Sequence, residues 1–128
     1  MSSSTPQLLS IQILDRPDTP SRQIAAGEHI VRAGDEAHEM FLVRNGRVEI
    51  QVNGKTVEEI GPGGIFGELA LIDHSKRSAD AVAAEPSDVI PIDDRLFVVL
   101  VQETPFFALD VMRILAERLR AMNEKLAV

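Results

Sequence analysis

The sequence has 128 residues, of which 45% are apolar, and this is enough to build one compact core in a single domain. Its formal net charge of -7 at pH 7 repels phosphate backbones and anionic lipid, so we expect neither nucleic acid nor a membrane as a partner. The absence of cysteine excludes disulfides and thiolate metal sites, and no apolar run is long enough to cross a membrane, so we expect a cytoplasmic protein.

The N-terminal stretch lacks a regular pattern of apolar residues. It carries Pro6, Pro17 and Pro20, and its one short apolar run, over 8–14, fits an edge strand. From Ile24 onward, turn residues separate short apolar runs about every eight residues, which is typical of a sandwich or barrel. We therefore expect a partly ordered tail over 1–23 and one domain over 24–128.

Two Asn-Gly dipeptides, at 45–46 and 53–54, indicate β-hairpins. A two-residue type I′ turn needs positive φ angles at both central residues, and Asn and Gly both accept them. The sequence therefore predicts antiparallel pairing of 40–44 with 47–52, and of 48–52 with 55–60. Further strands are expected over 79–83 and 88–92, with a turn at 85–87 between them.

The last third of the chain changes to a helical period. Asp93 or Asp94 can cap a short helix that runs through Leu100. Thr104-Pro105 is the start signal of a second helix, because Pro is favoured at the first helical position.

Apolar residues then recur at steps of three and four, which predicts an amphipathic helix of about five turns. They are Leu109, Met112, Leu115, Leu119, Met122 and Leu126. We expect the first half of this helix to pack on the core, together with Phe106 and Phe107. The part past Leu119 should form a lid or pack on a partner helix.

The stretch 61–83 carries the strongest signal for chemistry. Its glycine-rich start leads into Phe66-Gly-Glu-Leu-Ala-Leu71, which indicates a strand end followed by one helical turn. The unpaired amide N–H groups of such a turn favour an anion, and Gly67 has no Cβ to keep a ligand away. Arg77 follows nine residues after Glu68, and its planar guanidinium can hold phosphate oxygens.

Glu68 and Arg77 together indicate one kind of ligand. Taken alone, Glu68 would be an acid at a helix N-terminus and Arg77 a solvated surface residue. A nucleoside cyclic phosphate, however, has one free ribose hydroxyl and one phosphate charge, so it needs both a carboxylate acceptor and a cation. The two residues at this spacing, after these glycines, favour the ligand-binding interpretation.

The order Phe66-Gly-Glu-Leu-Ala-Leu71, a short loop and Arg77-Ser-Ala79 resembles the phosphate-binding cassette of the cyclic-nucleotide-binding domain family. We call residues 66–79 the cassette. The stretches 26–35 and 40–49 also resemble the first strands of that family, so the resemblance covers about residues 24–126. It implies a mainly β fold, a double-stranded β-helix or jelly-roll-like β-roll, with C-terminal helices from about residue 93.

The resemblance also implies a site and a ligand. Glu68 would bind the ribose hydroxyl and Arg77 the cyclic phosphate, with the backbone around Gly67, Leu69 and Ala70 completing the phosphate site and Ser78 near the phosphate and base edge. The implied function is a regulatory domain that binds cyclic AMP rather than cyclic GMP and needs no cofactor. It would signal through its C-terminal helix to a partner protein or within a homodimer. The helices that usually precede the β-roll are not visible in 1–23.

Two other interpretations stay open at this point. The domain could be a ligand-free adaptor that keeps the cassette for folding alone. A metal enzyme of the related cupin barrel would need two histidines one residue apart, and His29, His38 and His74 are not so spaced, so we expect no metal site. No Ser, His and Asp grouping is visible near a nucleophile, and we expect that the chain is not an enzyme.

Overall fold

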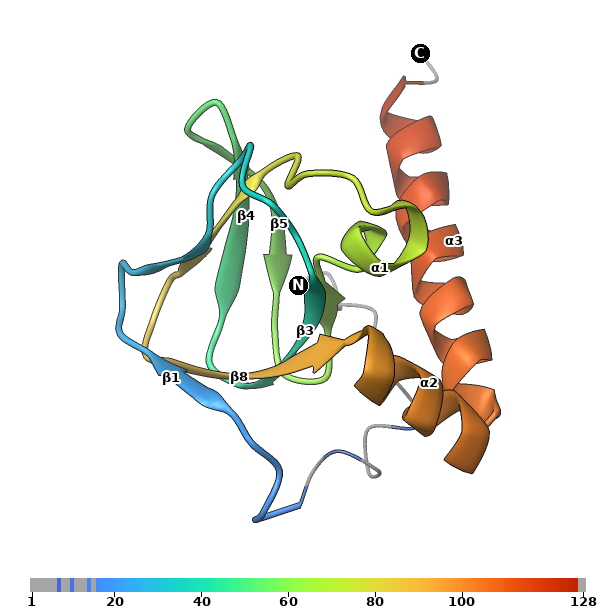
Figure 1. Ribbon diagram of the computed structural model, residues 1–128. Coiled ribbons are helices and arrows are strands. Elements are labelled where there is room, and N and C mark those ends of the chain that lie inside the picture. Colours follow the sequence, from blue (N-terminus) through green and yellow to red (C-terminus); the bar gives the residue numbers. More distant parts are fainter. Residues whose placement is uncertain (1–6, 8–9, 11–13, 15, 127–128) are drawn as a thin grey trace.

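The computed structural model describes residues 7, 10, 14 and 16–126, the last two by their backbone only. In this part of the chain, two four-stranded antiparallel sheets face each other as a roll, and the C-terminal helices lie against one side of it (Figure 1). One sheet has the strand order β1-β8-β3-β6 and the other β2-β7-β4-β5. The predicted mainly β roll with C-terminal helices is confirmed.

The strands and helices have the following bounds. The first sheet contains β1 (Arg22–Ile24), β8 (Ser87–Asp93), β3 (Glu39–Asn45) and β6 (Ile65–Phe66). The second contains β2 (His29–Val31), β7 (Asp80–Ala83), β4 (Val48–Val52) and β5 (Lys55–Ile60). The helices are α1 (Leu69–Asp73), α2 (Asp94–Glu103) and α3 (Phe106–Leu126), and no described helix has the length and apolar character needed to span a bilayer.

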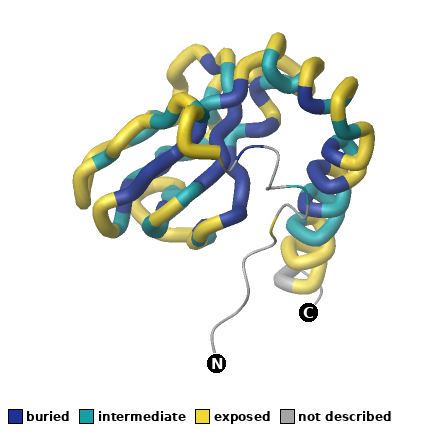
Figure 2. The backbone as a smooth tube through the Cα atoms, turned by 90° about the horizontal axis from the view of Figure 1, so that it is seen from below, coloured by how far each residue is buried: buried dark blue, intermediate teal, exposed yellow. Residues whose placement is uncertain are grey.

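Strand β3 lies at the centre of the core because both of its faces are buried. Met40 and Leu42 belong to the cluster that contacts the helices, whereas Phe41 and Val43 belong to the cluster between the two sheets. A strand covered on both faces is a continuous apolar run, as this one is. Figure 2 shows the buried residues gathered along the strands and on one side of α3.

Of the two predicted hairpins, one is present. β4 pairs with β5 around Asn53 and Gly54, whose φ angles are 52° and 80°. At Asn45-Gly46 only Gly46 has a positive φ, 93°, so a type I′ turn does not form. β3 pairs with β6 and β8, and β4 lies in the other sheet. The predicted pairing of 40–44 with 47–52 is therefore wrong, and Asn45-Gly46 is a corner between the sheets.

The start signals of both C-terminal helices are confirmed. The Asp93 carboxylate accepts a hydrogen bond from the Leu96 N–H at 2.9 Å and so caps α2. Helix α3 begins at Phe106, directly after Pro105. The N–H of Thr104 closes α2 by donating to the Leu100 carbonyl at 2.8 Å.

The core face of α3 differs from the predicted one. Phe107, Val111 and Ile114 are buried, whereas another apolar stripe of this helix is exposed. That outer stripe consists of Phe106, Leu109, Met112 and Leu119, which are 54–58% exposed. Both stripes have helical spacing, and periodicity alone does not say which of them meets the roll. The predicted apolar contact of Leu126 lies outside the side chains that the structure describes.

The N-terminal segment is attached to α3 at a buried carboxylate. Asp110 is 1% exposed, and its Oδ2 accepts hydrogen bonds from the backbone N–H and the hydroxyl of Ser10 at 2.7 and 2.5 Å. Leu14 is buried in the same cluster as Phe107. Most of the predicted edge strand over 8–14 lies outside the described residues, and the division of the chain near residue 23 stays a prediction.

Gly46 packs so tightly against the corner between β7 and β8 that it leaves no room for a side chain. A Cβ atom there would lie 2.3 Å from the Ser87 hydroxyl oxygen and 2.7 Å from the Pro86 carbonyl oxygen. We predict that Gly46→Ala lowers the free energy of unfolding by about 2–5 kcal/mol, because it adds a contact clash to the cost of a left-handed backbone.

Gly54→Ala is the matched control for this substitution. Gly54 also has a positive φ, but nothing lies within 4 Å of its Cβ position, so we expect a loss of about 1–2 kcal/mol. Urea unfolding of both variants measures the difference. Equal losses would contradict the close packing of this corner.

Candidate functional site

The cassette forms one wall of a cavity between the roll and α3. Strand β6 ends at Phe66 and α1 begins at Leu69, which is the predicted strand end followed by one helical turn. The cavity has a volume of about 300 Å³, within the usual range for small-molecule sites. It is lined by all the predicted site residues, Gly67, Glu68, Leu69, Ala70, Arg77 and Ser78.

The Arg77 guanidinium lies in a fixed position under the cassette. Its Nη1 donates to the Gly67 carbonyl at 3.2 Å and its Nη2 to the Glu39 carbonyl at 2.7 Å. The guanidinium carbon lies 5.6 Å from the centre of the Phe41 ring, in reach of a cation–π interaction. Its Nε is buried and has no hydrogen-bond acceptor among the described residues. A phosphate oxygen would supply the missing acceptor.

Burial lowers the pKa of Arg77, and the nearby carboxylates of Glu39, Asp35 and Glu68 partly oppose this effect. An arginine side chain nevertheless stays protonated in proteins, so the site keeps its positive charge. Gly67 makes this arrangement possible, since a Cβ atom there would lie 2.7 Å from Arg77 Nη1. The glycine therefore makes room for the arginine, and its φ of 77° suits no other residue well.

Glu68 faces the cavity and is already bound on one side. It is 8% exposed, and its Oε1 accepts a hydrogen bond from Nη1 of Arg118 at 2.7 Å. Its Oε2 makes no hydrogen bond within the described part of the chain. This carboxylate can therefore accept a hydroxyl group from a ligand without giving up its protein partner.

Arg118 of α3 is a residue of the site that sequence reasoning missed. Besides Glu68, it binds Glu58 of β5, whose Oε2 lies 2.9 Å from Arg118 Nε, and its Nη2 donates to the Ile65 carbonyl. Its side chain is 18% exposed. The signal was present in the helical period, because Arg118 stands four residues after Ile114 on the core face, where a charge needs a partner.

The cavity wall opposite the cassette is apolar. It is formed by Val31, Ile50, Val52 and Val57 of the roll and by Met122 of α3. Val52, Val57 and Met122 are 42–58% exposed although they are large apolar side chains. Such a wall suits a planar, weakly polar ligand group, and Met122 places the last part of α3 over the cavity, where a lid was predicted.

Backbone donors at the start of α1 complete the polar side. The amide N–H groups of Glu68 and Leu69 make no hydrogen bond within the described residues. The N–H of Ala70 instead donates to the Gly67 carbonyl at 3.3 Å. Ser78 is exposed at the edge of the cavity.

Asp80, three residues beyond Arg77, is bound elsewhere. Its carboxylate accepts a hydrogen bond from the Ala33 N–H at 2.7 Å and lies 3.5 Å from His29 Nε2. The hydrogen bond from Ala33 lowers the pKa of Asp80. Its carboxylate is thereby held away from Arg77.

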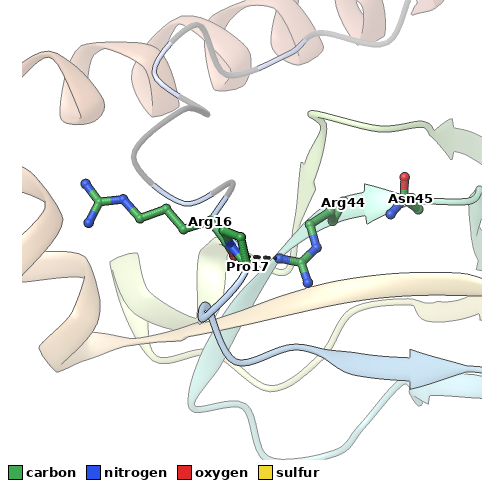
Figure 3. A pocket seen from close by; sticks show the side chains of 4 residues that line it. All are labelled: Arg16, Pro17, Arg44 and Asn45. Atoms are coloured by element: carbon green, nitrogen blue, oxygen red, sulfur yellow. Dashed lines mark hydrogen bonds between the residues drawn. The ribbon is translucent and has the colours of Figure 1, made fainter.

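A second cavity, of about 320 Å³, lies where the N-terminal segment crosses β3 (Figure 3). It is lined by Arg16, Pro17, Arg44 and Asn45. The two arginines do not converge, because Arg16 points away and Arg44 binds Asp88 at 2.9 Å and the Arg16 carbonyl at 3.2 Å. Among the described residues, no three His, Cys, Asp or Glu side chains are grouped so that they could hold a metal ion.

Comparisons with known proteins identify the family. A family model described as "Cyclic nucleotide-binding domain" matches residues 21–104. The "Cyclic AMP receptor protein" of Thermus thermophilus is 32% identical over 105 residues, which cover 78% of this chain and 49% of that protein.

Two solved structures have the same fold. The Catabolite Activator Protein of Thermus thermophilus superposes with a TM-score of 0.75 at 31% identity, over 84% of this chain and 53% of that one. A structure from work on a cyclic-GMP-dependent signalling pathway in bacterial phytopathogenesis gives a TM-score of 0.73 at 27% identity, over 94% of this chain and 98% of that one. This chain thus spans about half the length of the Thermus proteins. With a family model matched over most of its roll, and with the same fold, the chain belongs to the cyclic nucleotide-binding domain family.

Proposed function

We propose that this domain binds a cyclic purine nucleotide, cyclic AMP in preference to cyclic GMP, in the cavity between the cassette and α3. The observation that carries the proposal is that Glu68 and Arg77 line one cavity and each has an unused polar atom. Glu68 Oε2 would accept the ribose hydroxyl. Arg77 Nε and the amide groups of Glu68 and Leu69 would donate to the cyclic phosphate.

The apolar wall supports the preference for adenine. Guanine carries a carbonyl and an additional amino group, and each polar group that is buried without a partner costs about 1–3 kcal/mol. Val52, Val57 and Met122 offer such groups no hydrogen bond. Ser78 is the side chain nearest to this role, and its hydroxyl would serve a phosphate oxygen equally well. The name of the Thermus receptor supports the same choice.

We propose further that occupancy is passed on through α3. Arg118 connects this helix to Glu68, so a ligand that binds Glu68 favours one arrangement of α3 over another. The outer stripe of α3, from Phe106 to Leu119, would carry the signal to a partner protein or to a second copy of the chain. In this proposal the domain acts in the cytoplasm as a regulator and itself catalyses no reaction.

A ligand-free adaptor is the second candidate, and one observation favours it. Arg118 neutralises Glu68, and the carbonyls of Gly67 and Glu39 bind Arg77, so the protein's own groups already satisfy much of the site. In this case the cassette would serve folding alone.

Calorimetric titration of the protein with cyclic AMP and cyclic GMP separates the two candidates. We predict that both nucleotides bind and that cyclic AMP binds about ten-fold more tightly, which corresponds to one poorly satisfied polar group of guanine. Equal or reversed affinities would overturn the base preference. No binding of either nucleotide at millimolar concentration would favour the adaptor.

Two substitutions test the roles of the site residues. We predict that Arg77→Ala weakens cyclic AMP about ten- to a hundred-fold, because a charge-assisted hydrogen bond to phosphate is lost. Glu68→Gln should weaken it about ten-fold through the ribose hydroxyl, which then binds a neutral acceptor. Lys76→Ala is the control, since it removes the neighbouring exposed positive charge and should change the affinity less than three-fold. If Arg77→Ala and Glu68→Gln bind like the parent while remaining folded, the site assignment is wrong.

A further inference from the structure

Glu58 of β5 lies on the inner side of the roll, next to the ligand cavity. Glu58 and Ile60 alternate along the strand, and Ile60 is fully buried in the core between the sheets. A register shift in the ladder places Glu58 opposite Ile50 and leaves Val57 without a partner, as in a β-bulge. Bulges next to functional sites often re-aim a side chain. Here an acidic side chain with 32% exposure faces the cavity, and its partner is Arg118.

Arg118 is the last contact of α3 with the roll among the side chains that the structure describes. Residues 119–124 are all exposed, whereas Arg118 reaches back to Glu58 at 2.9 Å and to Glu68 at 2.7 Å. The position of the helix end that carries Met122 therefore depends on this one guanidinium. It has two carboxylate partners, and they differ in one respect, because Glu68 is proposed to bind the ligand and Glu58 is not.

We infer that Glu58 is a positioning residue for ligand binding: it holds Arg118, and with it the end of α3, over the cavity while Glu68 is engaged by the ribose. When a hydroxyl donates to Glu68, part of the negative charge that stabilises Arg118 is drawn to the ligand. Glu58 then becomes the main counter-charge of a largely buried cation, which is costly to leave unpaired. Glu58 is thus needed more in the bound state than in the free state.

This inference predicts the opposite sign from simple electrostatics. Removing an acidic side chain near an anionic ligand should strengthen binding through the general field. Removing the anchor of Arg118 should weaken it. The affinity change on Glu58→Gln therefore distinguishes a positioning role from a mere surface charge.

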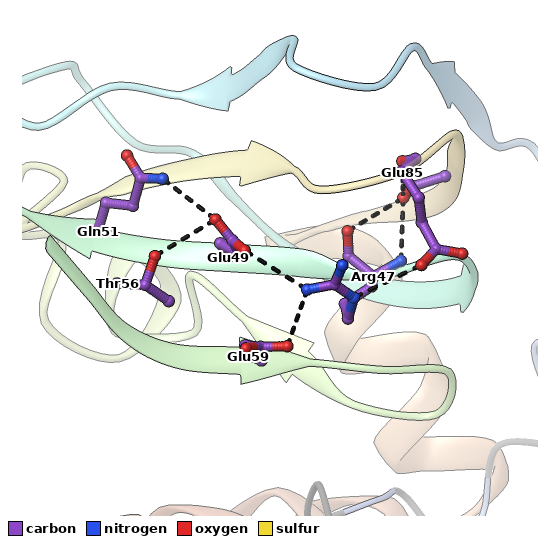
Figure 4. A network of polar contacts seen from close by, with 7 residues as sticks. Arg47, Glu49, Gln51, Thr56, Glu59 and Glu85 are labelled. Atoms are coloured by element: carbon purple, nitrogen blue, oxygen red, sulfur yellow. Dashed lines mark hydrogen bonds and ion pairs between the residues drawn. The ribbon is translucent and has the colours of Figure 1, made fainter. Parts of the chain in front are cut away.

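Glu59 provides a matched control on the same strand. It stands next to Glu58, is more exposed, and pairs with Arg47 at 2.9 Å in a network with Glu49 and Glu85 on the outer face (Figure 4). Glu59→Gln thus removes the same charge without touching Arg118. Glu58→Asp keeps the carboxylate on a shorter side chain and serves as the conservative variant.

The experiment measures two quantities on the full chain, the affinity for cyclic AMP by calorimetry and the amide hydrogen exchange of residues 119–124. We expect Glu58→Gln to weaken cyclic AMP about three- to ten-fold and to speed exchange in this segment about three-fold or more, with and without ligand. Glu58→Asp should recover part of both effects. Glu59→Gln should leave exchange unchanged and bind cyclic AMP as well as the parent or better.

The affinity measurement rests on the proposed function, whereas the exchange measurement in the ligand-free protein does not. If the parent chain binds no cyclic nucleotide, the proposed function fails, and exchange alone decides whether Glu58 holds α3. If Glu58→Gln matches Glu59→Gln in both measurements, Glu58 is a surface charge and the inference is overturned.

Discussion

The guanidinium of Arg118 connects the three parts of the site: the roll, the cassette and helix α3. It lies between Glu58 and Glu68 at 2.9 and 2.7 Å, with 18% of its side chain exposed. A cation withdrawn from water to this extent needs charged partners in good geometry, and losing one of them leaves an uncompensated charge. The group of three carries one excess negative charge, and Glu68 keeps an unused oxygen. A ligand hydroxyl is the kind of donor that this arrangement lacks, whereas a bare anion is not, so phosphate must be bound at the other end of the cavity.

That other end is built from backbone and from Arg77. The arginine lies against Phe41 and donates to two carbonyl groups, and Gly67 leaves the space that it occupies. The side chain is therefore held in place before a ligand arrives, which reduces the conformational entropy that binding must cost. Carboxylate and guanidinium lie on one cavity but on different contacts, so the ribose end communicates with α3 and the phosphate end with the roll. In the proposed function, the ribose contact is the one that carries the signal.

Local chemistry made much of the fold and the cassette predictable, and long-range packing limited the rest. The β4–β5 hairpin, the strand and turn of the cassette and the cap of α2 depend on neighbouring residues, and the structure confirms them. The corner at Asn45-Gly46 depends on Ser87, about forty residues away, and no pattern around 45–46 shows it. Helix α3 carries two apolar stripes, and only the packed roll selects between them. Arg118 meets Glu68 and Glu58 across 50 and 60 residues of sequence, so the central contact of the site is visible in the folded chain alone.

The most direct test of the account is a nuclear magnetic resonance titration that follows the Nε–H signals of the arginine side chains while cyclic AMP is added. The Arg77 Nε–H has no acceptor in the described structure, so its signal should shift strongly as it binds the phosphate. The Arg118 Nε–H, which donates to Glu58, should stay bonded and shift only slightly. If saturating cyclic AMP leaves the Arg77 signal where it is in the free protein, the nucleotide does not bind at the cassette and the central claim is wrong.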